Sequence, residues 1–225
     1  MDDKLLSKLS QNLLEILDDD EYYDITIEVG NDPYVKVFRA HMVILNYRSP
    51  YLRRILIITF QHAELISKWI DKLEIKDKLT TSYEFKLLYR YDSQYNLEFK
   101  FDKIREICKN QSHTVVIIKV QGNNEILGGY NPIKWKFDGY YGITKDSFIF
   151  SFSHDSIENY ILSRVKDKNR AIYSDIYQLR FGASDLTLTI DSISSCDKYA
   201  YEKQIRKSNY GSSVKELEVF QIVQG

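Results

Sequence analysis

The chain has 225 residues, of which 44% are hydrophobic and 14% aromatic, enough to pack one large domain or a medium and a small one. Its 31 basic and 32 acidic residues leave a net charge of -1, which excludes a general attraction to nucleic acid or to an anionic membrane. The two cysteines, Cys108 and Cys196, lie far apart and favour a reducing compartment. The chain starts without a basic leader and contains no apolar run of the roughly 20 residues that a membrane helix needs, so we expect a cytoplasmic protein.

The first elements of the chain are a helix and a hairpin. Leucine and isoleucine recur at helical spacing over residues 3–17, which predicts an amphipathic helix. Residues 24–29 alternate strictly between apolar and polar side chains and predict a strand, with a turn at 30–33 and a hairpin partner at 34–38. Short helices are expected on either side of the Arg-Ser-Pro break at 48–50.

The pattern changes from residue 62, where helical signals come first and strand signals follow. A helix is predicted over residues 65–73, a short helical segment over 83–90 and a longer helix over 97–108. The predicted strands are 114–120, 125–130, 134–137, 147–152, 185–190 and 217–223. Short strands joined by Gly, Asn and Asp turns indicate an α+β fold, an antiparallel β-sandwich with helices packed outside it.

The strand at 147–152 carries three phenylalanines at alternate positions. Because side chains of a strand alternate between its two faces, Phe148, Phe150 and Phe152 share one face and Ile149 lies on the other. We expect the three aromatic rings to face the core of the sandwich.

The sequence lacks the common catalytic and metal-binding motifs. It contains no G-x-S-x-G, Walker A, H-E-x-x-H or G-x-G-x-x-G pattern, and its four histidines have no partner at the spacing of metal ligands. We therefore expect no cofactor and no metal.

A few side chains nevertheless have chemical potential. Glu216 and Glu218 share a strand face. The alternatives there are an acid–base pair, two carboxylates in solvent, or a buried Glu218 that is bound to backbone or to an arginine. Cys108 lies on the apolar stripe of its helix, which favours a buried, inert thiol over a redox-active one. Gly128 and Gly129 interrupt a strand and indicate a bulge or a close backbone approach.

Basic residues cluster at 166–170 and again at Lys203, Arg206 and Lys207. Most such clusters are solvated loop charge, and the alternative is a surface for an acidic partner.

From residue 64 onward the chain resembles the TLDc domain of the oxidation-resistance proteins. The resemblance lies in the order and spacing of six stretches, with Trp135 between the third and the fourth: SYEFKLLY (82–89), TVVIIK (114–119), ILGGY (126–130), DSFIFSF (146–152), FGASDL (181–186) and ELEVF (216–220). The positions that match the family motifs are Gly128, Gly129, Tyr130, Trp135, Phe181, Gly182, Asp185, Leu186, Glu216, Glu218 and Phe220.

The beginning of the chain resembles the start of a BTB/POZ domain. The similar stretches are YDITIEV (23–29), FRAH (38–41), IL (44–45) and RSPYL (48–52), with Asp24, Phe38, His41 and Ser49 as the motif positions. Since the rest of that fold does not follow, we expect a truncated BTB/POZ segment at 1–60 and a TLDc domain at 62–225. So small a fragment has a marginal core, so it must pack on the TLDc domain, self-associate or remain loosely folded.

These resemblances imply a non-enzymatic protein-interaction protein. TLDc domains are linked to oxidative-stress protection and to binding the V-type proton pump, so the expected partner is the pump or another stress-related protein. The first alternative is a substrate adaptor of a cullin-type ubiquitin ligase, which the incomplete BTB segment makes the weaker expectation. The second alternative is a hydrolase or thiol enzyme that uses Glu216 and Glu218 or Cys108.

Overall fold

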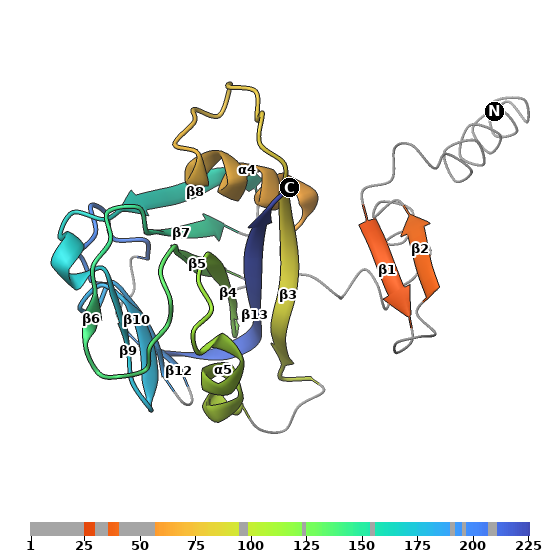
Figure 1. Ribbon diagram of the computed structural model, residues 1–225. Helices are drawn as coiled ribbons and strands as arrows, with labels where there is room; N and C mark the ends of the chain where they lie inside the picture. The colour runs from red at the N-terminus through yellow and green to blue at the C-terminus, as the bar shows by residue number, and fades with distance from the viewer. Residues whose placement is uncertain are drawn as a thin grey trace, which may run out of the picture. The chain divides into compact units, whose positions relative to one another are not determined.

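The structure is a computed structural model (Figure 1), in which the chain divides into two compact units, Met1–Leu56 and Ile57–Gly225. The described residues are 25–29, 36–40, 57–94, 99–122, 125–153, 156–189, 192–194, 197–206 and 211–225. The predicted helix at 3–17 and the short helices around 48–50 lie outside the described residues.

The first unit contains the predicted hairpin. Strand β1 (Ile25–Val29) pairs with β2 (Lys36–Ala40) in antiparallel register, with Ile27 opposite Phe38. The strand and its hairpin partner are thus confirmed, and both lie within one or two residues of the predicted bounds.

The second unit is built on a sheet of 11 strands that curls into two layers (Figure 1). The first layer contains, in spatial order, β3 (Tyr83–Asp92), β13 (Ser212–Gln224), β4 (Thr114–Val120), β5 (Ile126–Asn131), β7 (Phe148–Ser153) and β8 (Ser156–Arg164). The second layer contains β6 (Tyr141–Gly142), β9 (Ile172–Ser174), β10 (Gln178–Phe181), β11 (Leu186–Thr189) and β12 (Ser192–Ser194). The first residues of β13 pair with β12 and so join the layers, and every pairing between these strands is antiparallel.

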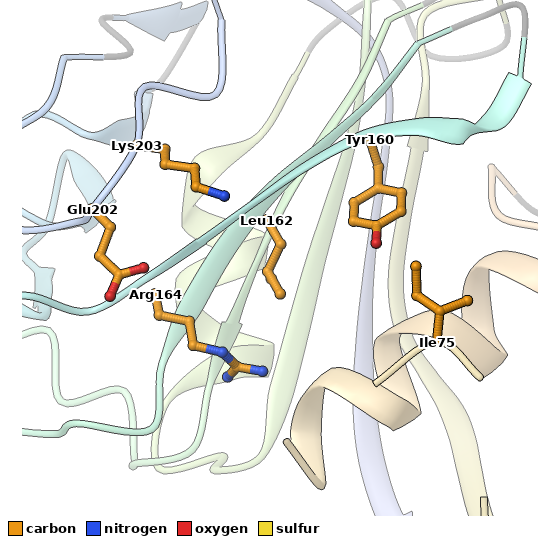
Figure 2. Close-up of a pocket in the computed structure, with 6 residues that line it drawn as sticks. All are labelled: Ile75, Tyr160, Leu162, Arg164, Glu202 and Lys203. Atoms are coloured by element: carbon orange, nitrogen blue, oxygen red, sulfur yellow. The ribbon is translucent and has the colours of Figure 1, made fainter. Parts of the chain in front are cut away.

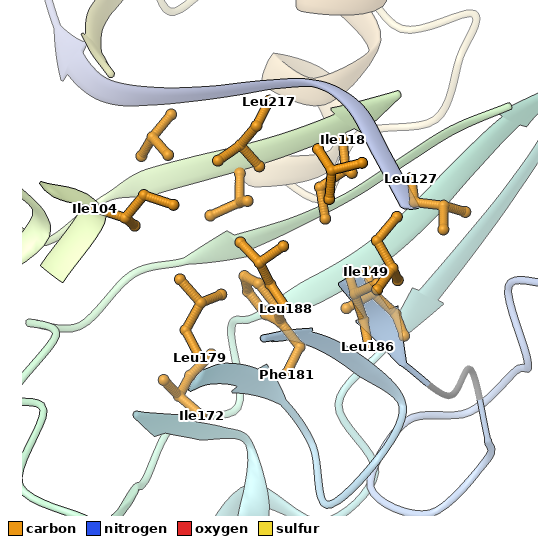
Figure 3. Packing of buried hydrophobic residues seen from close by; sticks show 14 of the residues in the cluster. Ile104, Ile118, Leu127, Ile149, Ile172, Leu179, Phe181, Leu186, Leu188 and Leu217 are labelled. Carbon is orange, nitrogen blue, oxygen red and sulfur yellow. The ribbon is translucent and has the colours of Figure 1, made fainter. Parts of the chain in front are cut away.

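One hydrophobic core fills the space between the two layers (Figure 3). Leu217, Ile118, Leu127 and Ile149 from the first layer face the side chains of β9, β10 and β11. Helix α5 (Phe101–Cys108) adds its buried face to the same core. The predicted antiparallel, β-rich fold with flanking helices is therefore confirmed, although a single curled sheet supplies both layers.

A second hydrophobic layer covers the other face of the first layer. Helix α4 (Phe60–Ile70) begins at the Thr59 cap, and Trp69 on its buried face stacks on Phe152, with 5.7 Å between the ring centroids. Trp69 also packs against Phe148 and Phe150, at 6.0 and 5.5 Å. The three phenylalanines share one face, as predicted, but they face α4, and it is Ile149 that faces the sandwich core. The prediction of their target was wrong because alternation identifies which residues share a face and leaves open what covers it, and both faces of β7 are buried.

Two predicted elements are absent from the structure, and the helix predicted over 65–73 is shifted toward the N-terminus, to residues 60–70. Residues 83–92 form strand β3 and no helix, because hydrogen bonding to β13 along its length overrides the ambiguous apolar spacing. Residues 134–137 form no strand, and only Trp135 makes an isolated bridge, to Lys109. Among the described residues, a 3-10 turn, η1 (Lys168–Arg170), lies in the basic segment. Within the described ranges, no helix is long and apolar enough to cross a membrane.

Candidate functional site

The paired glycines of β5 allow close packing on both faces of the sheet. A Cβ atom on Gly129 would lie 2.7 Å from the Phe181 ring, and one on Gly128 would lie 2.7 Å from the Val116 carbonyl oxygen and overlap the Phe150 ring. The pairing of β5 with β4 and with β7 continues through both glycines without a bulge. Of the two predicted roles, the close backbone approach is therefore the one observed.

Asp185 is an anchor for a loop of the second layer. Its carboxylate is fully buried and accepts the backbone N–H groups of Tyr199, Ala200 and Tyr201 at 2.8 to 3.1 Å. Gly182 adopts a φ of +76°, and a side chain there would overlap the Asp185 carboxylate. The FGASDL motif thus shapes a turn around a buried acid, which ties the segment before Tyr201 to the sheet.

The aromatic and aliphatic motif residues belong to the packed interior. The indole N–H of Trp135 donates to the Thr114 hydroxyl at 2.8 Å, and its ring meets Phe181 edge-on at 5.7 Å. Tyr130 stacks on Phe148, and burial raises the pKa of Tyr130 well above its usual range. Leu186 and Phe220 are also buried, at 1% and 2% exposure.

Glu216 and Glu218 form an ion cluster with two basic residues of neighbouring strands. Glu218 is fully buried, accepts the Ile57 N–H at 2.9 Å and pairs with the Arg90 guanidinium at 2.8 Å. Glu216 accepts the Lys119 ammonium at 2.9 Å and lies 3.5 Å from Arg90. Of the three predicted alternatives, the buried Glu218 bound to backbone and arginine is confirmed.

Burial raises the pKa of Glu218 to about 7, and this effect outweighs the Ile57 N–H and the Arg90 charge, which lower it. A carboxyl with such a pKa is suited to proton transfer. Here, however, both oxygens are engaged inside the fold, one by the start of the domain and one by β3. Glu218 therefore joins the segment before α4, through the Ile57 N–H, to strand β3, through Arg90.

Cys108 is fully buried on α5, as its place on the apolar stripe predicted. Burial raises the pKa of the Cys108 thiol to about 12, so the thiolate is scarce near neutral pH. The helix itself was predicted correctly, although α5 starts at Phe101.

The remaining predicted positions have structural roles or lie outside the described residues. Of the four histidines, His62 lies in the first turn of α4 and completes the Thr59 cap by accepting the Thr59 N–H at 3.1 Å, and burial lowers the pKa of its imidazole. Phe38 lies in β2, whereas Asp24, His41 and Ser49 lie outside the described residues. Across the described ranges, no group of three or more His, Cys, Asp or Glu side chains is arranged to hold a metal.

A groove of about 590 Å³ lies beside β8, on the face that α4 covers (Figure 2). Side chains from β8, from the turn after α4 and from the segment before β13 gather around it. The lining residues are Ile75, Tyr160, Leu162, Arg164, Glu202 and Lys203.

Three of the residues that line the groove are held in place by contacts to α4. The Tyr160 ring packs on Trp69 at 5.2 Å, and the Lys68 ammonium donates to the Ile75 carbonyl oxygen at 2.7 Å. Arg164 donates to the Trp69 carbonyl oxygen at 3.0 Å. These contacts fix the part of the groove that Ile75, Tyr160 and Arg164 form.

The groove is apolar at one end and charged at the other. Tyr160, Leu162 and Ile75 line the apolar end, while Arg164, Glu202 and Lys203 line the charged end (Figure 2). Burial lowers the pKa of Arg164, and the Glu202 and Asp146 carboxylates act in the opposite direction. Sequence reasoning noted only Lys203, because three separated segments form the groove and no local motif unites them.

The architecture defines a class of β-rich domain. Its antiparallel sheet is curled, its motif residues lie in the interior, and a groove lies at one edge of the sheet. Residues 55–223 match the family model described as the TLDc domain. Since the match covers most of the chain, the chain belongs to the TLDc family. The match gives no support to the BTB/POZ resemblance of residues 1–60, and no curated protein matches the chain.

Proposed function

We propose that this chain is a non-enzymatic protein-interaction protein that acts through its TLDc domain in protection against oxidative stress, with the V-type proton pump as its partner. The observation that carries the proposal is the TLDc match over residues 55–223. The groove beside β8 supports it, because a partly apolar surface hollow is suited to part of a protein partner.

The contacts of the reactive side chains favour binding over catalysis. Both oxygens of Glu218 are bound inside the fold, and Glu216 is paired with Lys119. The Cys108 thiol has a pKa raised to about 12, opposite to what a nucleophilic thiol requires. These groups stabilise the domain, and the groove residues are left as the surface for recognition.

We also propose that residues 1–60 derive from a BTB/POZ domain that has lost its later elements, and that the protein works in the cytoplasm. The support is the β1–β2 hairpin, which follows the strand pattern of that resemblance. This segment would contribute little cullin affinity. A specific stable interface buries about 1,200 Å² or more, and a fragment that has lost its later elements is too small to supply that area.

The test has a survival arm and a binding arm. Cells that lack their own TLDc proteins are challenged with peroxide while they express the whole chain or a variant with both cysteines replaced by serine. Equal protection by the two chains is expected, and protection that requires the cysteines would instead indicate a thiol enzyme.

In parallel, the whole chain is used as bait for the purified cytosolic sector of the pump and for a purified cullin. We expect the pump sector to bind. Binding of the cullin alone would replace the proposal with the adaptor alternative.

A further inference from the structure

The two end strands of the first layer, β3 and β8, differ in their charge. Among the described strands, β3 pairs only with β13, and β8 pairs only with β7. Four of the ten residues of β3 are charged, which is how natural sheet edges avoid pairing with other chains. In β8, by contrast, the five residues from Asn159 to Ser163 carry no charge. The β8 edge therefore lacks the protection that β3 has.

Along this uncharged stretch, every second residue of β8 points its backbone N–H and C=O groups away from β7, which is called outward here. Arg164 uses its outward carbonyl to accept the Glu202 N–H at 3.0 Å, whereas Val165 donates toward the other side, to Ser147. Because the direction alternates along a strand, the N–H and C=O groups of Leu162 and Tyr160 point outward too. The part of the chain that the structure describes gives these groups no hydrogen-bond partner.

The segment beside β8 leaves the strand just before this open stretch. Val165 pairs with Tyr201, but at Lys203 the backbone N–H donates to the Ser163 hydroxyl at 2.7 Å and no longer to strand backbone. The covered end of β8 thus stops where the groove begins. An added strand would lie along the same edge that carries the groove's side chains.

The side chains of β8 define what such a strand should contain. Tyr160, Leu162 and Arg164 alternate along one face and line the groove together (Figure 2). Among the lining residues, a carboxylate near Arg164 would meet two cations, Arg164 and Lys203, against one anion, Glu202. The other carboxylate that acts on Arg164, Asp146, is paired with the Lys72 ammonium at 2.6 Å. The Tyr160 end offers Ile75 and an aromatic ring to an apolar side chain.

We propose that the open edge of β8 binds an extended segment of a partner protein, which adds as one further strand and directs an acidic side chain toward Arg164 and Lys203. This inference rests on the proposed function and names the chemistry of the partner. Backbone hydrogen bonds would supply affinity, and the groove would supply specificity. Because residues opposite Tyr160 and Arg164 lie four positions apart, the segment should carry an apolar residue about four positions from the acid.

The test is a selection of random peptides of about ten residues on the whole chain, a length that covers the open stretch at ~3.3 Å per residue. Peptides that are enriched are then measured by fluorescence anisotropy against three variants. Leu162→Pro removes an outward N–H without removing a bond to β7, and Lys203→Glu reverses an exposed charge. Lys86→Glu makes the same charge change on β3 and is the matched control. Thermal unfolding of each variant confirms that it is folded.

We expect the enriched peptides to share an acidic residue near an apolar one, and to bind the wild type and Lys86→Glu alike. Leu162→Pro and Lys203→Glu should each weaken binding about tenfold or more, or about 1.4 kcal/mol. The inference is wrong if selection on the wild type enriches no peptide beyond those that selection on Leu162→Pro also enriches. It is also wrong if the enriched peptides lack an acid or bind Lys203→Glu equally well. In that event, continued binding of the pump sector to the whole chain would leave the proposed function standing, whereas loss of binding in both tests would refute both.

Discussion

The buried Glu218 should make the stability of the TLDc unit depend on pH near neutrality. Its pKa is about 7 in the folded protein, against an ordinary value of 4.5, chiefly because burial disfavours the charged form. The folded protein therefore retains a proton that the unfolded chain releases between these values. The stabilising contribution is present in full below about pH 4.5 and is lost as the pH rises through about 7.

The size of the effect follows from the two pKa values. The gap between 4.5 and about 7 corresponds to about 3 kcal/mol in total, at roughly 1.4 kcal/mol per pKa unit. Between pH ~8 and pH ~5.5 the linkage relation gives about 2 kcal/mol of this. Arg90 remains paired when Glu218 is protonated, since Glu216 lies 3.5 Å from it.

The assay compares the wild type with Glu218→Gln, which keeps the shape of the side chain but does not titrate. Urea unfolding is followed by tryptophan fluorescence, which reports on the TLDc unit because both tryptophans, Trp69 and Trp135, belong to it. Relative to the variant, the wild type should gain about 2 kcal/mol when the pH falls from ~8 to ~5.5. Subtracting the variant removes the contribution of every other titrating group. A difference that stays constant across this range would refute the raised pKa.

Three further changes test the packing. Phe150→Ala should lower the free energy of unfolding by about 3–5 kcal/mol, because the ring is fully buried against α4; a urea midpoint that implies less than about 1 kcal/mol would contradict this packing. In a variant without the other cysteine, native Cys108 should react with a thiol reagent far more slowly than the urea-unfolded chain, and rapid native labelling would show an accessible thiolate. A shortened chain that starts at His62 should be less stable by about 3 kcal/mol than one that starts at the first residue of the family match, because it lacks the Thr59 cap and the buried Ile57. Equal urea midpoints of the two shortened chains would refute these roles.

The central strands could be predicted because their sequence leaves little choice. Strand β4 consists of β-branched residues buried on both faces, except for the half-buried Lys119, and its bounds agree with the prediction. The prediction of a helix in place of β3 was wrong, because Phe85, Leu88 and Tyr89 fit a helical spacing as well as a strand. Only the pairing of β3 with β13, more than 120 residues away, decides between them. In the second layer, the strand predicted at 185–190 corresponds to β11, whereas β6, β9, β10 and β12 have too few residues for any period to be recognised.

The candidate sites show the same limit. Sequence alone placed Glu216 and Glu218 on one face and included burial among the alternatives, but Arg90 and Ile57 join Glu218 from distances of 128 and 161 residues along the chain. The groove could not be predicted, because Ile75, Tyr160 and Lys203 meet only after the sheet has formed. Local patterns thus identified the two helices and the central strands, and topology decided the remaining strands and which side chains meet.

The most direct test of protein binding by the TLDc unit is site-specific photocrosslinking in cells under peroxide stress. A photoreactive residue replaces Glu202, which lines the groove without supplying a cation, or Glu84, an exposed acid on the opposite edge strand, as the control. We expect the probe at position 202 to capture a defined partner, the V-type pump sector, with crosslinks that the control position does not give. Capture of the same proteins at both positions, or no capture at position 202 by a folded and protective chain, would contradict binding through this edge.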